Sequence, residues 1–215
     1  MFRTSLLLIA LVQVAPCAVI NFEGLPSSGS KPGPPDNPAS ILTTQLSSLG
    51  VVFGRPGLSA GVSVVHNGTA YSSPNSVVGL DAAGNEPGWA TGDIYLHFVQ
   101  PGTLIPSVTN LVSFAIGDGG GDVDNIIIRA YDLADTQIDI QFYSSTEYQI
   151  YSLAMAGIHR LEVDFLPPDD TGLGGYHMDD LVFNDPAAAP EPATMMLCGA
   201  ALIALCIPRF RRNTN

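Results

Sequence analysis

The side chains that could do chemistry are present, but few of them are spaced for a reaction. The histidines are scattered, without a His-x-x-x-His or His-Glu-x-x-His pattern: they are His66, His97, His159 and His177. No Gly-x-Ser-x-Gly motif provides a serine nucleophile. Glu23 and Asp164 could be imagined as the carboxyl pair of a glycoside hydrolase, although nothing in the sequence places them together. These patterns favour a protein that is not an enzyme.

Two further groups could bind a ligand. One loop is rich in oxygen ligands: it contains Asp118, Asp122, Asp124 and Asn125. It lacks the regularly spaced ligand positions and the terminal Glu of an EF-hand calcium loop. We interpret this loop as a solvated hairpin connection rather than as a metal site. Trp89, the only tryptophan, lies in a Gly/Pro-rich loop. We favour a role for Trp89 in closing the core at a sheet edge, and stacking on a sugar ring is the alternative.

The N-terminus is typical of a secretory signal peptide. Arg3 precedes an apolar stretch at 6–12, and small residues follow up to Ala18, so we assign residues 1–18 to the signal. The three cysteines, Cys17, Cys198 and Cys206, all lie close to the chain ends. The region between them therefore has no disulfide, thiolate metal site or cysteine nucleophile, and its stability must come from an ordinary core.

The middle of the chain is strongly acidic. Residues 19–189 hold nineteen of the twenty acidic residues but four of the eight basic ones, so their formal charge is −15. Such a surface repels nucleic acid and anionic lipid. It suits a solvated outer surface or divalent cations.

Short alternating or apolar blocks, joined by Gly/Pro turns, predict strands rather than helices in this region. The clearest alternation lies at 93–99 and at 159–165, where Leu161, Val163 and Phe165 share one face and charges share the other. One helix is predicted at 41–49, capped by Ser40 and ended by Gly50. The fold class predicted for residues 19–185 is an all-β, antiparallel β-sandwich.

The chain ends in three parts: Pro190-Glu191-Pro192, the apolar run 195–207, and a basic stop. The stop consists of Arg209, Arg211 and Arg212. As a helix the run spans roughly 20 Å, which is short for a ~30 Å hydrocarbon core. Arginines directly after it favour a cytoplasmic C-terminus.

These three parts, at residues 186–215 with their spacer, resemble the PEP-CTERM sorting tail of exopolysaccharide-producing Gram-negative bacteria. The resemblance implies export, transient anchoring in the inner membrane and cleavage near Pro190–Pro192 by an exosortase-type enzyme. It also implies a final location in the cell envelope or outside the cell.

The order of segments from Ile20-Asn21-Phe22-Glu23 to the stretch 178–183 resembles the jelly-roll domains that accompany such tails. Those domains look like galactose-binding and carbohydrate-binding modules. In them a carboxylate from the first strand and one from the last can share a structural calcium ion. The resemblance implies that Glu23 and Asp179 or Asp180 hold Ca²⁺ here, and the alternative is that Asp179 and Asp180 are surface or turn acids.

We therefore expect an exported, non-catalytic protein of the matrix or cell surface, associated with exopolysaccharide or binding a glycan. The alternative is a secreted hydrolase that acts on glycans.

Overall fold

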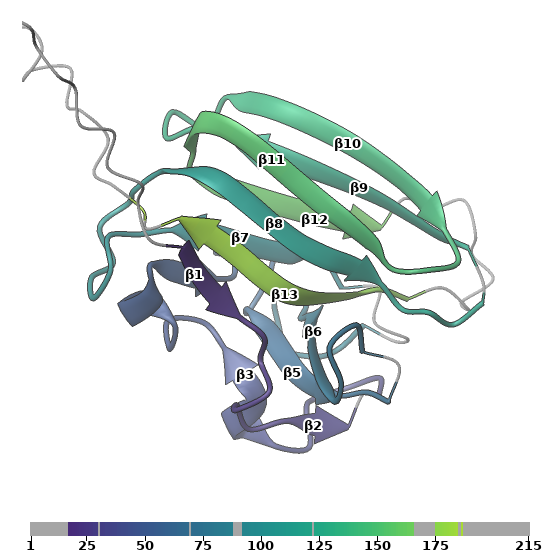
Figure 1. Cartoon of the computed structure of the whole chain (residues 1–215). Coiled ribbons are helices and arrows are strands. Elements are labelled where there is room, and N and C mark those ends of the chain that lie inside the picture. Colours follow the sequence, from purple (N-terminus) through teal and green to yellow (C-terminus); the bar gives the residue numbers. More distant parts are fainter. Residues whose placement is uncertain are drawn as a thin grey trace, which may run out of the picture.

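The chain folds into two β-sheets that pack face to face (Figure 1). The computed structural model describes residues 17–29, 31–68, 70–87, 92–121, 123–165, 175–184 and 186. Most strand pairs within these ranges are antiparallel, and β2 with β5 is the parallel exception. The predicted all-β antiparallel sandwich is confirmed.

The strands are β1 (Cys17–Ile20), β2 (Ser28–Gly29), β3 (Ile41–Leu42), β4 (Val51–Phe53), β5 (Val62–His66), β6 (Asn75–Gly79), β7 (Ile94–Phe98), β8 (Thr109–Gly117), β9 (Asp124–Tyr131), β10 (Gln137–Ser145), β11 (Gln149–Ile158), β12 (Arg160–Phe165) and β13 (His177–Asn184). Two 3₁₀ turns, η1 (Pro38–Ser40) and η2 (Ser47–Leu49), lie between the early strands.

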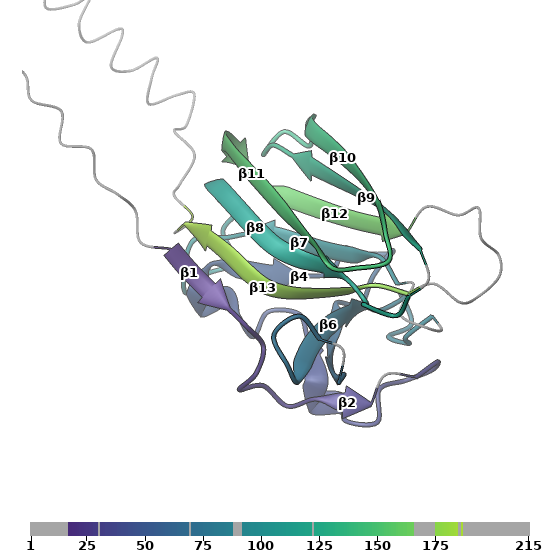
Figure 2. The same ribbon diagram turned by 45° about the vertical axis from the view of Figure 1, so that its right-hand side comes forward.

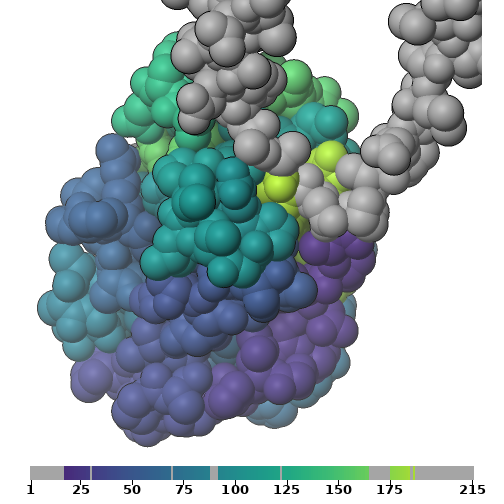
Figure 3. All heavy atoms as spheres, turned by 90° about the vertical axis from the view of Figure 1, so that its left-hand side faces the viewer, coloured from purple at the N-terminus to yellow at the C-terminus, as the bar shows by residue number. Residues whose placement is uncertain are grey.

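The eight-stranded sheet has the order β11-β8-β13-β6-β5-β2, with β1 beside β13 and β3 beside β5. The first and last strands therefore lie together, as the jelly-roll resemblance implies. Cys17 is opposite Asn184, and Ile20 is opposite Leu181. The space-filling view shows the purple N-terminal residues against the yellow-green last strand (Figure 3). The described chain consequently enters and leaves at one edge of the molecule.

The five-stranded sheet has the order β10-β9-β12-β7-β4. From β4 onwards the chain crosses repeatedly between the sheets, and β12 enters between β9 and β7, which come earlier in the sequence. This arrangement is visible in Figure 2, where β9, β12 and β7 lie behind β11, β8 and β13. Because these pairings join distant segments, the position of β12 sets the register of β9 relative to β7.

The core lies between the two sheets and consists of alternate side chains from each. Ile94, Leu96 and Phe98 of β7 are fully buried on the inner side. The Phe98 ring contacts the Phe183 ring of the opposite sheet, with centroids 5.2 Å apart. Apolar burial of this kind is the main stabilisation available to a chain whose described cysteine, Cys17, is not in a disulfide.

The predicted division of β12 into two faces is also found. Leu161 and Val163 are buried in the core. Arg160 and Glu162 instead join ion pairs on the opposite side of the sheet. The side chain of Phe165 lies outside the described part of the structure.

The predicted helix at 41–49 is wrong. Ile41 and Leu42 form β3, which pairs with Ser63 and Val62 of β5, and the following residues make turns that end in η2. Tertiary pairing thus overrides the weak helical periodicity. Gly50 does end the last turn, in the left-handed conformation with φ 95°.

The segments assigned to targeting lie largely outside the described residues. This applies to Pro190, Glu191 and Pro192, to the apolar run, and to Arg209, Arg211 and Arg212. Within the described ranges, no helix has the length and apolar character needed to cross a membrane. β1 begins at Cys17, two positions before the domain boundary predicted at residue 19. The boundaries remain predictions.

Two backbone segments cross closely where β6 meets the chain leading into β7. A Cβ added to Gly79 would lie 2.2 Å from the carbonyl oxygen of Gly92. Glycine is therefore required at this crossing, which leads directly into Asp93.

We expect Gly79→Ala to destabilise the protein by about 1–3 kcal/mol, because the backbone must move apart to accept a methyl group. This corresponds to a fall in Tm of several degrees, at roughly 2–4 °C per kcal/mol. The matched control is Gly68→Ala, since an added Cβ there has no atom within 4 Å. Thermal unfolding followed by circular dichroism measures both. Equal Tm values for the two variants would contradict the close crossing.

Candidate functional site

The outer face of the five-stranded sheet gathers most of the polar side chains that could recognise a ligand. The cross-strand register places them in rows. One row runs from Phe142 through Ile127 to Asp164, and the next from Ile140 through Arg129 and Glu162 to Tyr95. We call this surface the charged face, and it comprises Arg55, Asp93, Tyr95, His97, Arg129, Tyr131, Ile140, Phe142, Arg160, Glu162 and Asp164.

Ion pairs connect neighbouring rows of the charged face. Arg129 Nη1 donates to Asp164 Oδ2 at 3.0 Å, and Arg160 Nη1 donates to Glu162 Oε2 at 3.2 Å. Glu162 also lies 3.8 Å from Arg55 Nη1, so one carboxylate serves two guanidinium groups. These contacts hold planar donors and acceptors at fixed positions.

Two tyrosine rings support the guanidinium groups from beneath. The Cζ atom of Arg160 lies 3.7 Å from the centroid of the Tyr131 ring, and that of Arg55 lies 5.8 Å from the Tyr95 ring. Stacking of this kind favours Arg over Lys. Three of the four basic residues of region 19–189 are thus on the charged face. The fourth, Lys31, pairs elsewhere with Asp36.

Asp93 and Asp164 form a carboxyl pair on the charged face. Their side chains lie close enough to interact, and the Tyr95 hydroxyl donates to Asp93 Oδ2 at 3.2 Å. Burial, and then the negative charge of Asp164, raise the pKa of Asp93 to about 7. Near neutral pH a fraction of the Asp93 side chains can therefore carry a proton.

The edge of the charged face is apolar and open to solvent. On β10, Phe142 is 63% exposed and Ile140 is 41% exposed. Cross-strand pairing places Phe142 beside Ile127, in the row that ends at Asp164. An exposed aromatic ring therefore lies on the same sheet face as the fixed charged groups.

The residues predicted to hold calcium lie by the other sheet. Asp179 accepts hydrogen bonds from the Ser72 amide at 2.8 Å and from its hydroxyl, and Asp180 accepts from the same hydroxyl at 2.9 Å. Glu23 accepts from the Asn75 amide at 3.2 Å. Burial raises the pKa of Asp179 to about 6.

These contacts place Asp179 and Asp180 together on Ser72, whereas Glu23 contacts the start of β6. Among the described side chains, no group of three or more His, Cys, Asp or Glu residues is placed to hold a metal ion. These carboxylates thus already accept hydrogen bonds from other protein groups, so their arrangement alone does not define a calcium site. Calcium binding by Glu23, Asp179 and Asp180 stays a prediction.

The other sequence candidates have different outcomes. Asp164 belongs to the charged face, whereas Glu23 contacts the eight-stranded sheet, so the imagined glycosidase pair is not assembled there. Asp118 accepts a hydrogen bond from the Gly120 amide in its own loop. Asp122 and Trp89 lie outside the described residues.

One histidine has a serine partner, but that serine is inaccessible. His177 Nδ1 lies 2.9 Å from Ser76 Oγ, and its Nε2 lies 3.2 Å from Asn67 Nδ2. Ser76 is fully buried, and burial lowers the pKa of His177 to about 4. A buried hydroxyl cannot reach a substrate, so this pair has a structural role.

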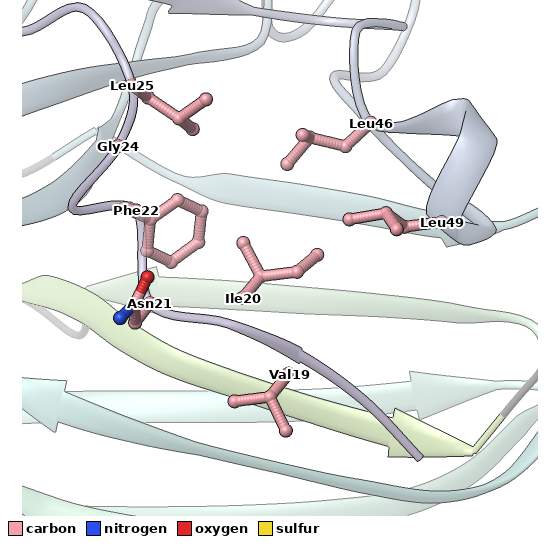
Figure 4. A pocket seen from close by; sticks show the side chains of 8 residues that line it. All are labelled: Val19, Ile20, Asn21, Phe22, Gly24, Leu25, Leu46 and Leu49. Atoms are coloured by element: carbon pink, nitrogen blue, oxygen red, sulfur yellow. The ribbon is translucent and has the colours of Figure 1, made fainter. Parts of the chain in front are cut away.

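A hollow of about 230 Å³ lies beside β1 and η2 (Figure 4). Its lining is apolar apart from Asn21: Val19, Ile20, Phe22, Gly24, Leu25, Leu46 and Leu49. It holds no charged side chain and offers few hydrogen bonds for a polar ligand. The charged face is therefore the stronger candidate.

Comparisons with known proteins identify distant likenesses in structure alone. No protein-family model matches the chain, and no curated protein matches it. A CBM27-1 module of Caldicellulosiruptor saccharolyticus, solved with mannohexaose, is 12% identical with a TM-score of 0.43, over 82% of this chain and 100% of that one. A mutant of CBM29-2, a family 29 carbohydrate-binding module, is 15% identical with a TM-score of 0.38, over 83% and 99%. At these values the likenesses support no argument about function.

Sequence reasoning missed the Asp93–Asp164 pair. The two residues are far apart in the sequence, and they meet because Val163 pairs with Ile94 in the register of β12 and β7. The one available signal was that both lie on the polar side of a clearly alternating strand or at its end.

The contribution of Asp93 to stability should decrease as pH rises from about 4 to about 7. The pKa of Asp93 is raised from 3.8 to about 7 in the folded chain, so the folded state binds that proton more tightly than the unfolded state does. The resulting stabilisation is fully present below the unfolded pKa and is lost as pH rises through the folded one. Asp179, with a folded pKa of about 6, acts in the same direction. His97 and His177 act in the opposite direction, because burial lowers the pKa of each from 6.5 to about 4. The Asp93 contribution is therefore read from a variant rather than from the wild-type slope.

Asp93→Asn keeps the position uncharged and should remove this contribution. Between pH 4 and pH 7 its stability should therefore fall less, or rise more, than that of the wild type, as measured by urea unfolding at several pH values. Glu147→Gln is the control, because it removes an exposed carboxyl group outside the charged face. A wild-type slope in Asp93→Asn would show that the carboxyl pair does not form.

Proposed function

We propose that this protein is an exported, non-catalytic glycan-binding module whose ligand lies on the charged face. The observation that carries the proposal is an exposed aromatic ring, Phe142, on the same sheet face as rigidly held guanidinium and carboxyl groups. Ligand sites typically combine apolar contact with a few fixed polar groups. An aromatic ring can pack on the C–H face of a sugar, while Arg129 and Asp164 can bond to its hydroxyls.

The polar groups of the charged face are held in place before any ligand arrives. Arg160 is stacked on Tyr131 and bonded to Glu162, and Arg129 is bonded to Asp164. Side chains that are already ordered lose little conformational entropy on binding. This arrangement supports recognition of a flat, polar and flexible polymer.

Charge favours a neutral glycan over an anionic one. Each guanidinium group of the charged face already pairs with a carboxylate, and the surrounding region has a formal charge of −15. A polyanion would meet repulsion without a free cation to offset it. The same argument disfavours nucleic acid as a partner.

A glycan hydrolase is the alternative, because a carboxyl group with a pKa of about 7 suits a general acid. The geometry opposes it. Glycoside hydrolases separate their two carboxyl groups by roughly 5–5.5 Å or 6.5–9.5 Å. Asp93 and Asp164 interact directly through their side chains, whereas both hydrolase mechanisms place a sugar or a water between the two carboxyl groups.

We further propose that the PEP-CTERM-like tail delivers the module to the cell envelope or the extracellular matrix through an exosortase-type enzyme. Exopolysaccharide is then the available glycan. The pairing of β1 with β13 supports this arrangement, because Cys17 lies opposite Asn184 and both ends of the described strands therefore lie together at one end of the eight-stranded sheet. Attachment there leaves the outer face of the other sheet accessible.

Binding should be measurable by affinity electrophoresis in gels that contain a neutral β-mannan, β-glucan or xylan, with alginate as the anionic comparison. We expect retardation by at least one neutral polymer and none by alginate. Phe142→Ala should weaken binding roughly tenfold, since a stacked aromatic contributes on the order of 1–2 kcal/mol.

Leu104→Ala is the matched control, because Leu104 is 62% exposed but lies in a loop away from the charged face. An equal loss of glycan binding in Phe142→Ala and Leu104→Ala would overturn the module proposal. So would the absence of binding to any neutral polymer. Reducing sugars released during incubation would instead identify a hydrolase.

Processing can be tested on the native protein by intact-mass spectrometry. The mature form should have lost residues up to about Ala18 and the tail beyond Pro190–Pro192. A secreted form that still contains the 195–207 peptide would rule out cleavage of the tail.

A further inference from the structure

The edge of the eight-stranded sheet carries a long strand whose first half, Gln149 to Ala154, lacks protection against pairing. β11 has ten residues and, in the described part of the chain, pairs with β8 alone. Figures 1 and 2 both show it as the outermost strand of that sheet. Its free edge presents unpaired backbone donors and acceptors, which are a template for another strand.

The two edge strands on this side of the sandwich differ. β10, the edge of the other sheet, carries Asp139 and an irregular register between Gln137 and Asp139. A charge and a bulge are the usual protections of an edge. β11 has no charged residue and no proline. Its register with β8 shifts between Ala154 and Ile158 but is regular from Gln149 to Ala154. The regular part of β11 is therefore open to pairing.

The backbone direction identifies the residues that face the free edge. Ser113 Oγ donates to the carbonyl of Tyr151 at 2.8 Å, so the Tyr151 carbonyl points toward β8. In an antiparallel strand, successive residues direct their backbone groups to opposite sides. The N–H and C=O groups of Ile150, Ser152 and Ala154 consequently point to the free edge.

The geometry points to a second copy of this chain as the occupant: we propose that two copies pair antiparallel through β11, about a two-fold axis at Ser152. A two-fold axis brings the same strand from each copy together. With the axis at Ser152, Ile150 of one copy lies beside Ala154 of the other, on the same face. Three residues of each strand then complete their backbone hydrogen bonds.

Charge argues for self-association at this edge rather than elsewhere. Copies whose middle region has a charge of −15 repel one another over most of their surface. Residues 148–158 contain no charged side chain, and neither does the neighbouring strand β8. Two copies that meet through β11 therefore bring no like charges of β8 or β11 together. Added salt should screen the remaining repulsion and strengthen the dimer.

Three substitutions at one position test this dimer in the full-length chain. Ser152→Pro removes the N–H that points to the free edge, and proline is tolerated in an edge strand on that side. Ser152→Glu places two carboxylates against each other at the axis. Ser152→Ala, the matched control, keeps the backbone donor and adds no charge. Sedimentation velocity over a range of protein and salt concentrations reports the mass, and circular dichroism melting reports folding.

We expect the wild type and Ser152→Ala to be dimers that strengthen with salt, and Ser152→Glu to be monomeric with an unchanged fold. Ser152→Pro should also be monomeric; if it fails to fold, Ser152→Glu decides. A monomeric wild type at the highest soluble concentration overturns the proposal. So does a dimer in all three variants, which would locate the interface elsewhere. A monomeric Ser152→Ala overturns it too, since backbone pairing does not need the hydroxyl.

Discussion

The entry of β12 between β9 and β7 is the constraint on which the rest of the molecule depends. It completes the five-stranded sheet and directs Leu161 and Val163 into the core. The same register directs Arg160, Glu162 and Asp164 outward, where each meets partners from neighbouring strands. A slip of one residue would exchange the two sets of side chains. Core packing and the charged face are therefore specified together, by one strand.

The charged face is stable because its charges satisfy one another. Arg160 is buried, and isolated burial of a guanidinium group would be costly. Its contacts with Glu162, Asp135 and the Tyr131 ring offset that cost. Removing one member of such a buried pair typically costs about 3–5 kcal/mol, because the other charge is left without a partner. The same contacts that stabilise the face also fix its geometry for a ligand.

The sequence was most predictive where a segment's own pattern decides its structure. Alternation predicted β7 and β12 and their faces, because period-two burial is a local property. It failed at Ile41 and Leu42, where pairing with β5 outweighs a weak helical pattern. It could not find the Asp93–Asp164 pair, which exists through the register of two distant strands. The exposed Phe142 was likewise unremarkable in the sequence, since its importance comes from the row that it shares with Asp164.

The distribution of charge separates the surface into regions with different roles. Three of the four basic residues of region 19–189 are paired on the charged face, so the surface elsewhere has a large excess of acid. That excess keeps copies of the protein apart and disfavours polyanions. It also gives significance to the uncharged strands β8 and β11, because they form a surface at which a second copy meets less repulsion than elsewhere. The charged face lies on the outer side of the opposite sheet, so pairing through β11 would leave two such faces available to one polymer, and their effects could combine as avidity.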